Sequence, residues 1–209
     1  RLVVLNGRFD AEASDIGDLP TGASVAPLSS AVDDVAPDLE DKLAKIAPSE
    51  GAPLVALNTA FMRDGLVLKL DKDVQLERPV QVLHVVDAGD TTLAVHPRTL
   101  ILAGDNAGAT VVETFAGTCG AAYWTNAVSE IKIGRNASII HVKRQADSLE
   151  AYHTALTQVR LDRDARYRSV ALATGAALSR NETRVAFEGE GAEASLAGGA
   201  LLRGRQHAD

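Results

Sequence analysis

The sequence predicts a mainly β protein whose larger part winds into a parallel β-helix. Two observations support this prediction. A phrase made of a polar turn, one alanine and a short strand recurs along the second half of the chain. Its alanines, at positions 107, 137, 165 and 192, are 30, 28 and 27 residues apart. A fixed period of this length is typical of repeat proteins in which each unit stacks on its neighbours. Within each unit, apolar and polar residues alternate as they do in a strand.

The turns of the repeat contain the residue types that tight corners need. Gly, Asn and Asp tolerate a positive φ, and they occur at residues 104–106 and again at 134–136. The alanine after each corner fits where a narrow coil leaves little room. In the strand that follows, Thr157, Val159 and Leu161 share one parity, opposite Gln158 and Arg160. We therefore expect coils lined by small aliphatic groups. An antiparallel β-sandwich, which also has many short strands, is the alternative fold.

The first 63 residues differ from the repeat and are predicted to form a small mixed α/β cap, with the β-helix core at 64–209. Residues 2–6 indicate a strand, and residues 10–30, rich in Asp, Gly, Pro and Ser, indicate a loop. We expect a helix over residues 31–47, with Pro37 near its start. Apolar residues recur there at helical spacing: Val32, Val35, Leu39, Leu43 and Ile46. This cap would cover the open end of the first coil.

Composition excludes several classes of function. The net charge is −7, and only 4% of the 209 residues are aromatic. Residues 51–209 carry nearly equal numbers of acidic and basic side chains, so they lack the concentrated positive field of a nucleic-acid-binding protein. No apolar run is long enough to span a membrane. The single cysteine excludes an internal disulfide and indicates a reducing, cytoplasmic location.

No catalytic, cofactor or metal site is predicted from the residues. The positions that come nearest to metal ligands are Cys119, in a glycine-flanked loop, and His207 and Asp209, whose spacing places both on one face of a strand. Each lacks the neighbouring ligands that a metal site requires. His141 and His153 are a further pair that would face each other across one coil, but two imidazoles without a third ligand do not make a zinc site.

The sequence as a whole resembles a known family. An ordered set of phrases along the chain is similar to the SufB/SufD family of the SUF iron–sulfur cluster assembly system. Residues 178–182 and 206–209 are more similar to its SufD branch than to SufB. The phrases lie at residues 56–61 with 64–65, 96–101, 126–131, 134–137, 175–182 and 189–194, and at 206–209.

The resemblance implies a right-handed parallel β-helix that acts as a non-enzymatic scaffold. It implies SufB and a SufC ATPase as partners, with a homodimer when the chain is isolated. The iron–sulfur cluster would belong to the assembled SufBCD complex, and this chain alone would bind no cofactor. In the family, the SufC-binding helical segment and a Cys-x-His-Gly motif follow the β-helix. Neither occurs in this sequence, which therefore corresponds to the first half to two-thirds of such a protein.

The alternative function is a carbohydrate-active enzyme, a polysaccharide lyase or hydrolase built on a β-helix. Such an enzyme needs carboxylates that converge on a groove, together with aromatic platforms for sugar rings. With one Trp and three Tyr, platforms are scarce. An acyltransferase β-helix is not favoured, because its hexapeptide repeat does not occur here. We therefore expect a scaffold and no enzymatic activity.

Overall fold

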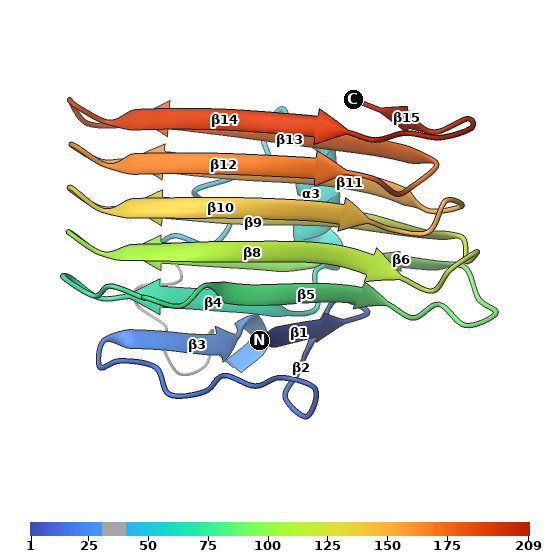
Figure 1. The fold of residues 1–209 in the computed structure, drawn as a ribbon, viewed down its shortest axis with the longest axis horizontal. Helices are drawn as coiled ribbons and strands as arrows, with labels where there is room; N and C mark the ends of the chain where they lie inside the picture. The colour runs from blue at the N-terminus through green and yellow to red at the C-terminus, as the bar shows by residue number, and fades with distance from the viewer. Residues whose placement is uncertain (31–40) are drawn as a thin grey trace.

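The computed structural model describes residues 1–30 and 41–209, which form a stack of flattened coils (Figure 1). Each coil contributes one strand to each of two sheets. The first sheet has seven strands in the order β14-β12-β10-β8-β5-β1-β2, and the second has eight in the order β15-β13-β11-β9-β7-β4-β3, with β6 paired to β9. The strands are β1 (Leu2–Leu5), β2 (Arg8–Asp10), β3 (Ala23–Pro27), β4 (Gly65–Leu70), β5 (Val80–Val86), β6 (Leu93–Val95), β7 (Arg98–Ala103), β8 (Gly108–Gly117), β9 (Tyr123–Ile133), β10 (Ser138–Ala146), β11 (Tyr152–Leu161), β12 (Arg166–Ala173), β13 (Leu178–Phe187), β14 (Glu193–Ala200) and β15 (His207–Ala208).

The strands of successive coils pair in parallel and in register. Val111 of β8 is opposite His141 of β10, which is opposite Ser169 of β12. In the other sheet, Ser129 of β9 is opposite Thr157 of β11. Among the described residues only β1–β2 and β3–β4 are antiparallel pairs. The predicted parallel β-solenoid is therefore confirmed, and the antiparallel sandwich is wrong.

One corner of the stack is built from aligned residues with positive φ. Asp73, Asn106, Asn136, Asp164 and Gly191 have φ of 66°, 58°, 55°, 57° and 72°. Their side chains continue the alignment, because the Asn106 amide donates to Asp73 at 2.7 Å and the Asn136 amide donates to Asn106 at 3.0 Å. Asx residues suit this conformation, which other L-residues adopt at a cost.

The alanine that follows each corner lies inside the coil, as expected. Ala107, Ala137 and Ala165 are almost fully buried, and Ala192 packs against the same cluster in the last coil. The Ala137 carbonyl accepts from the Arg166 amide of the next coil, and the Ala137 amide donates to the Gly134 carbonyl within its own turn. The period seen in the sequence is therefore the period of the coil.

The N-terminal segment departs from the prediction in two places. Residues 23–27, predicted as loop, form β3, which pairs with β4 from Ala23↔Leu70 to Pro27↔Leu66. The expected helix over 31–47 falls partly on residues 31–40, which lie outside the described residues. Residues 41–47 form turns, so the helix is wrong for that part. Leu43 and Ile46 nevertheless pack inward against Leu28, Val67 and other apolar residues.

A short helix, α3 (Pro53–Phe61), lies against the outer face of the second sheet (Figure 1). Its contact with the sheet combines the apolar side chain of Val55, which packs against Val128 and Leu156, with the fully buried polar side chain of Asn58. Asn58 donates to the carbonyls of Pro97 and Asn126 at 3.1 and 2.8 Å and accepts from Arg98 at 3.0 Å. Arg98 in turn pairs with Glu130. β1 also joins the first sheet by pairing in parallel with β5, so the N-terminal residues are part of the stack, and a boundary at residue 64 stays a prediction.

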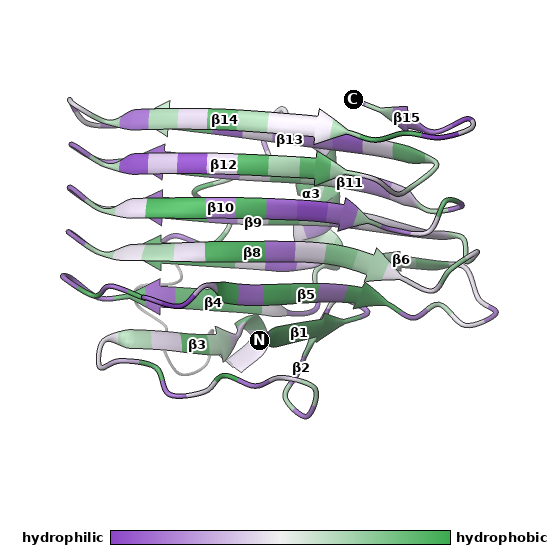
Figure 2. Cartoon of the chain, viewed as in Figure 1, coloured by the Kyte–Doolittle hydropathy of each residue, from purple (hydrophilic) through white to green (hydrophobic). Residues whose placement is uncertain are grey.

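The interior of the coils has two different halves. Near the turn that precedes β8, β10 and β12, the lining is aliphatic. Further along the same strands it becomes polar, and Figure 2 shows this change along β10, from hydrophobic to hydrophilic. The expectation of a lining of small aliphatic groups is correct for the first half only. The buried members of the aliphatic half include Leu66, Leu68, Val82, Ile101, Ile131, Ile133, Ile139, Val159 and Leu161.

Candidate functional site

The polar half of the interior is the candidate site, because it gathers most of the buried titratable side chains onto a few adjoining strands. Strand alternation puts it there: in β10, residues 139, 141, 143 and 145 share the inward parity, and all four are nearly fully buried. Along the strand these inward residues change from apolar, Ile139, to polar, His141, Lys143 and Gln145. Buried polar groups require partners, and the neighbouring coils supply them.

Glu113 of β8 is the centre of the first cluster. Its Oε1 accepts from Nε2 of His84 at 3.2 Å and from the hydroxyl of Thr99 at 2.9 Å. Its Oε2 accepts from Nε2 of His141 at 2.8 Å and from the hydroxyl of Ser129 at 3.2 Å. These donors come from β5, β7, β10 and β9. Four donors surround a carboxylate that has no exposed surface.

This arrangement keeps Glu113 ionised. Burial alone would raise the pKa of the carboxyl, but the hydrogen bonds from His141 and His84 outweigh it and hold the pKa well below the ordinary value. An ionised carboxylate only accepts hydrogen bonds. Both imidazoles therefore carry a hydrogen on Nε2, which fixes their tautomers when they are neutral.

Lys143 lies beside this cluster and points toward the next coils. Its ammonium donates to the hydroxyl of Thr157 at 3.0 Å and to the side-chain carbonyl of Asn181 at 3.4 Å. The ammonium also lies 5.8 Å from the centre of the Phe115 ring, within cation–π range. Burial lowers the pKa of Lys143, and the charge of Glu113 acts in the opposite direction.

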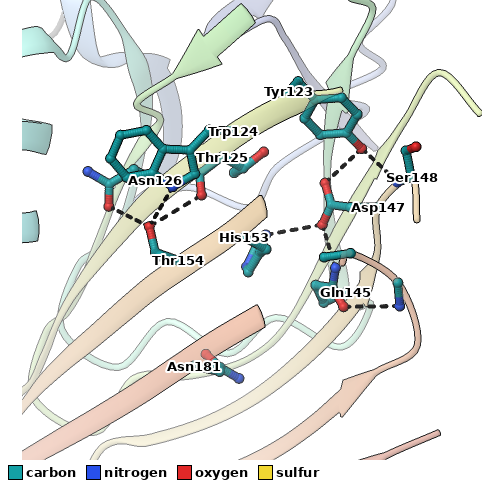
Figure 3. Close-up of polar contacts among 12 residues, drawn as sticks. Tyr123, Trp124, Thr125, Asn126, Gln145, Asp147, Ser148, His153, Thr154 and Asn181 are labelled. Atoms are coloured by element: carbon teal, nitrogen blue, oxygen red, sulfur yellow. Dashed lines mark hydrogen bonds and ion pairs between the residues drawn. The ribbon is translucent and has the colours of Figure 1, made fainter. Parts of the chain in front are cut away.

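Asp147 is the centre of a second cluster, at the turn between β10 and β11 (Figure 3). Its Oδ1 accepts from the Tyr123 hydroxyl at 2.9 Å, and its Oδ2 accepts from the Gln145 amide at 2.8 Å. Nδ1 of His153 lies 3.1 Å from Oδ2, at ion-pair distance rather than in an aligned hydrogen bond. Burial would raise the pKa of Asp147, but His153, Gln145 and Tyr123 together lower it. Burial and the Asp147 charge raise the pKa of Tyr123.

Four buried polar atoms near these clusters have no hydrogen-bond partner within the described part of the chain. They are Nδ1 of His84, the hydroxyl oxygen of Thr125 and both ring nitrogens of His153, of which Nδ1 lies at ion-pair distance from Asp147. A carboxylate next to an imidazole with a free nitrogen is the arrangement of a general base. His153 is only 1% exposed, however, and its ring packs edge-on against Phe115. The geometry therefore supports a structural network, since its side chains are enclosed by the protein.

The residues named from the sequence as metal-ligand candidates lie away from this network. Cys119 is exposed in the turn between β8 and β9. His207 is exposed on β15, which β13 and β11 separate from β9. Asp209 forms an ion pair with Arg180. Over residues 1–30 and 41–209, no group of three or more His, Cys, Asp or Glu side chains is placed to hold a metal ion.

His141 and His153 lie on β10 and β11, which belong to the two opposite sheets, as expected for residues across one coil. Each contacts its own carboxylate, His141 that of Glu113 and His153 that of Asp147. The partners of His84 and His96 were not foreseen. His96 lies 3.3 Å from the Asn126 amide, and burial lowers its pKa. The sequence signal that could have placed His141 and Lys143 in the interior is strand parity, because both share the inward face of β10 with Ile139.

Two family models match this chain. One is described as SUF system FeS cluster assembly, SufBD core domain, and matches residues 84–209. The other is described as SufBD protein N-terminal region and matches residues 1–82. Together they cover both the N-terminal strands with α3 and the stacked coils. No helix in the described ranges has the length and apolar character needed to cross a bilayer.

Three curated proteins show what the chain is similar to. An iron–sulfur cluster assembly SufBD family protein of Synechocystis sp. is 29% identical over 218 residues, which cover 100% of this chain and 48% of the relative. SufD of Bacillus subtilis is 37% identical over 91 residues, 42% of this chain and 20% of the relative. The chloroplastic protein ABCI7 of Arabidopsis thaliana is 25% identical over 189 residues, 88% of this chain and 39% of the relative. The chain thus spans less than half the length of each relative.

Proposed function

Because the chain belongs to the SufB/SufD family of the SUF iron–sulfur cluster assembly system, we propose that it is a SufD-type scaffold subunit of a cluster assembly complex. In this proposal it catalyses no reaction itself. It pairs with a SufB homologue and a SufC ATPase, and the nascent cluster is the cargo of the assembled complex. The identity to SufD of Bacillus subtilis supports the SufD type. The cytoplasm stays the predicted location, and a homodimer stays the prediction for the isolated chain.

The observation that carries the proposal is the agreement of the two family models with the whole stack. The SufBD N-terminal model covers residues 1–82 and the SufBD core model covers residues 84–209. The described residues in these ranges form two sheets whose strands pair in register from coil to coil, a rigid body of the kind that a scaffold subunit needs.

The buried clusters support a scaffold rather than an enzyme. A glycoside-cleaving enzyme needs two carboxyl groups that face a sugar in an open groove. Glu113 and Asp147 each hold several protein donors and face the interior of the coils. Their hydrogen-bonding capacity is used in joining strands. No observation therefore favours the carbohydrate-active alternative.

Co-purification of the intact protein with its SufB and SufC homologues tests the proposal. The wild-type protein is expected to give a stoichiometric complex. If no complex forms while both partners are folded, the scaffold proposal fails.

A further inference from the structure

The two imidazoles that hold Glu113 differ at their second ring nitrogen. Both donate from Nε2, so each has a bare Nδ1 when neutral. Nδ1 of His84 has no partner in the described part of the chain, and its ring stacks on Phe115 with the ring centres 4.4 Å apart. Nδ1 of His141 lies 3.0 Å from the hydroxyl of Tyr167. Of the two, only His141 has a group at each nitrogen that can accept a hydrogen.

The charges in this interior favour the uptake of one proton. The carboxylates of Glu113 and Asp147 are buried with a single ammonium, that of Lys143. While the imidazoles are neutral, the carboxylates outnumber the ammonium, and an added positive charge balances them. His153 faces Asp147 and is the other imidazole near this charge. The groups that face Glu113 from adjoining strands are His84 on β5, Thr99 on β7, Ser129 on β9 and His141 on β10.

We propose that His141 is the residue that binds this proton, and that Tyr167 reverses its hydrogen bond when it does so. In the neutral state, the Tyr167 hydroxyl donates to Nδ1 of His141. When Nδ1 carries a hydrogen, it donates to the Tyr167 oxygen, which a phenol hydroxyl accepts equally well. The Tyr167 hydrogen then turns away from the ring, and the Ser169 hydroxyl, which acts to lower the pKa of Tyr167, is the group on β12 that can accept it. A proton on His84 would instead leave a buried donor without an acceptor, which is costly.

His153 is disfavoured as the proton-binding residue for the same reason. Its Nδ1 already lies beside Asp147, and its Nε2 has no partner within residues 1–30 and 41–209. A doubly protonated His153 would therefore bury one unsatisfied donor, as His84 would. His141 is the one member of the three whose neighbours accommodate both ring hydrogens.

The proposed switch connects successive coils. Glu113 lies on β8, His141 on β10, and Tyr167 and Ser169 on β12. Ser169 is in register with Leu196 of β14, the exposed last strand. Protonation of His141 thus changes the direction of hydrogen bonds from β10 to β12, the strand that pairs with β14. This inference does not depend on the proposed function.

Histidine-selective ¹⁵N NMR of the intact protein tests the proposal. The side-chain nitrogen shifts distinguish neutral tautomers from the protonated ring, and they are followed between about pH 5 and pH 8. Resonances are assigned with single His→Gln substitutions. Two variants that each remove one buried phenol hydroxyl are compared: Tyr167→Phe removes the acceptor at His141, and Tyr123→Phe, the matched control, removes a donor to Asp147.

In the wild-type protein, His141 is expected to become protonated while His84 and His153 are still neutral. Tyr167→Phe should move the protonation of His141 to lower pH by about one unit or more, since one unit corresponds to a modest loss of interaction with the charged form. Tyr123→Phe should leave His141 unchanged. Protonation of His84 or His153 before His141, or equal behaviour of the two variants, would overturn the proposal. If Tyr167→Phe does not fold, the order of protonation in the wild-type spectra decides.

Discussion

Arg98 and Glu130 form a fully buried ion pair between neighbouring coils. Nη2 and Nε of Arg98 lie 2.6 and 2.8 Å from Oε1 of Glu130, and neither side chain is exposed. The carboxylate also accepts from the backbone amides of Ala44 and Ala47 at 2.9 and 2.8 Å. One glutamate on the outer face of β9 thus holds both the arginine of β7 and the N-terminal segment that lies over the sheet.

We predict that Glu130→Gln destabilises the protein by about 3 kcal/mol or more, because it leaves the Arg98 charge buried without its partner. The free energy of unfolding is measured by urea denaturation. Glu188→Gln is the matched control, since Glu188 pairs with Lys132 at 3.2 Å on the surface. Exposed pairs contribute about 1 kcal/mol or less. Equal losses for the two variants would show that burial of the Arg98 pair does not matter.

We predict that Ala137→Lys destabilises the protein by at least about 3 kcal/mol, because a long charged side chain would enter a corner that has no room for it. Ala137 is 1% exposed. The next residue, Ser138, is exposed, so Ser138→Lys is the control and should melt with the wild type. An unchanged melting temperature for Ala137→Lys would mean that the alanine does not line the coil.

The corner residues provide a third prediction. Asn136→Ala should cost about 1 to 2 kcal/mol, because alanine is disfavoured at φ of 55° and the side-chain bond to Asn106 is lost. Asn136→Gly should cost less, since glycine adopts a positive φ freely. Thermal unfolding of both variants measures the difference. A glycine variant that is less stable than the alanine variant would contradict the conformational argument.

Stability should also depend on pH in the acid range because of Glu113. Its pKa in the folded protein is well below the ordinary value of 4.5, so its contribution to stability is fully present above pH 4.5. That contribution is lost as the pH falls below 4.5 toward the folded pKa, because the unfolded chain then binds the proton first. Asp147, whose pKa is also lowered, acts in the same direction.

The variant Glu113→Gln isolates this effect. At pH 7 it should be less stable than the wild type by about 3 kcal/mol or more, since a neutral amide cannot accept from all four donors. The difference from the wild type should shrink as the pH is lowered below 4.5. Urea denaturation at a series of pH values measures both proteins. A difference that stays constant with pH would show that the wild-type carboxyl is not ionised.

The architecture of the coils could be predicted from the sequence because local residue patterns determine it. Alanine spacing gave the coil period, and strand parity gave the inward face of residues such as Val159 and Leu161. What local patterns do not give is the partner of a buried polar side chain. His141 and Glu113 are 28 residues apart and meet only because β8 and β10 stack in register.

The N-terminal segment was harder to predict for the same reason. Leu43 and Ile46 have helical spacing and do pack inward, yet residues 41–47 form turns. Their backbone amides at Ala44 and Ala47 bond to Glu130, which lies more than eighty residues later in the chain. A tertiary contact therefore overrides the local helical preference, and periodicity alone cannot reveal it.

Native mass spectrometry is the most direct test of the central claim. That claim is that this chain is a scaffold subunit of a cluster assembly complex. The intact protein is co-expressed with its SufB and SufC homologues, and the masses of the assemblies are recorded. The account predicts one dominant species that contains this chain with both partners in fixed stoichiometry. A chain that is found only by itself, while SufB and SufC assemble with each other, would contradict it.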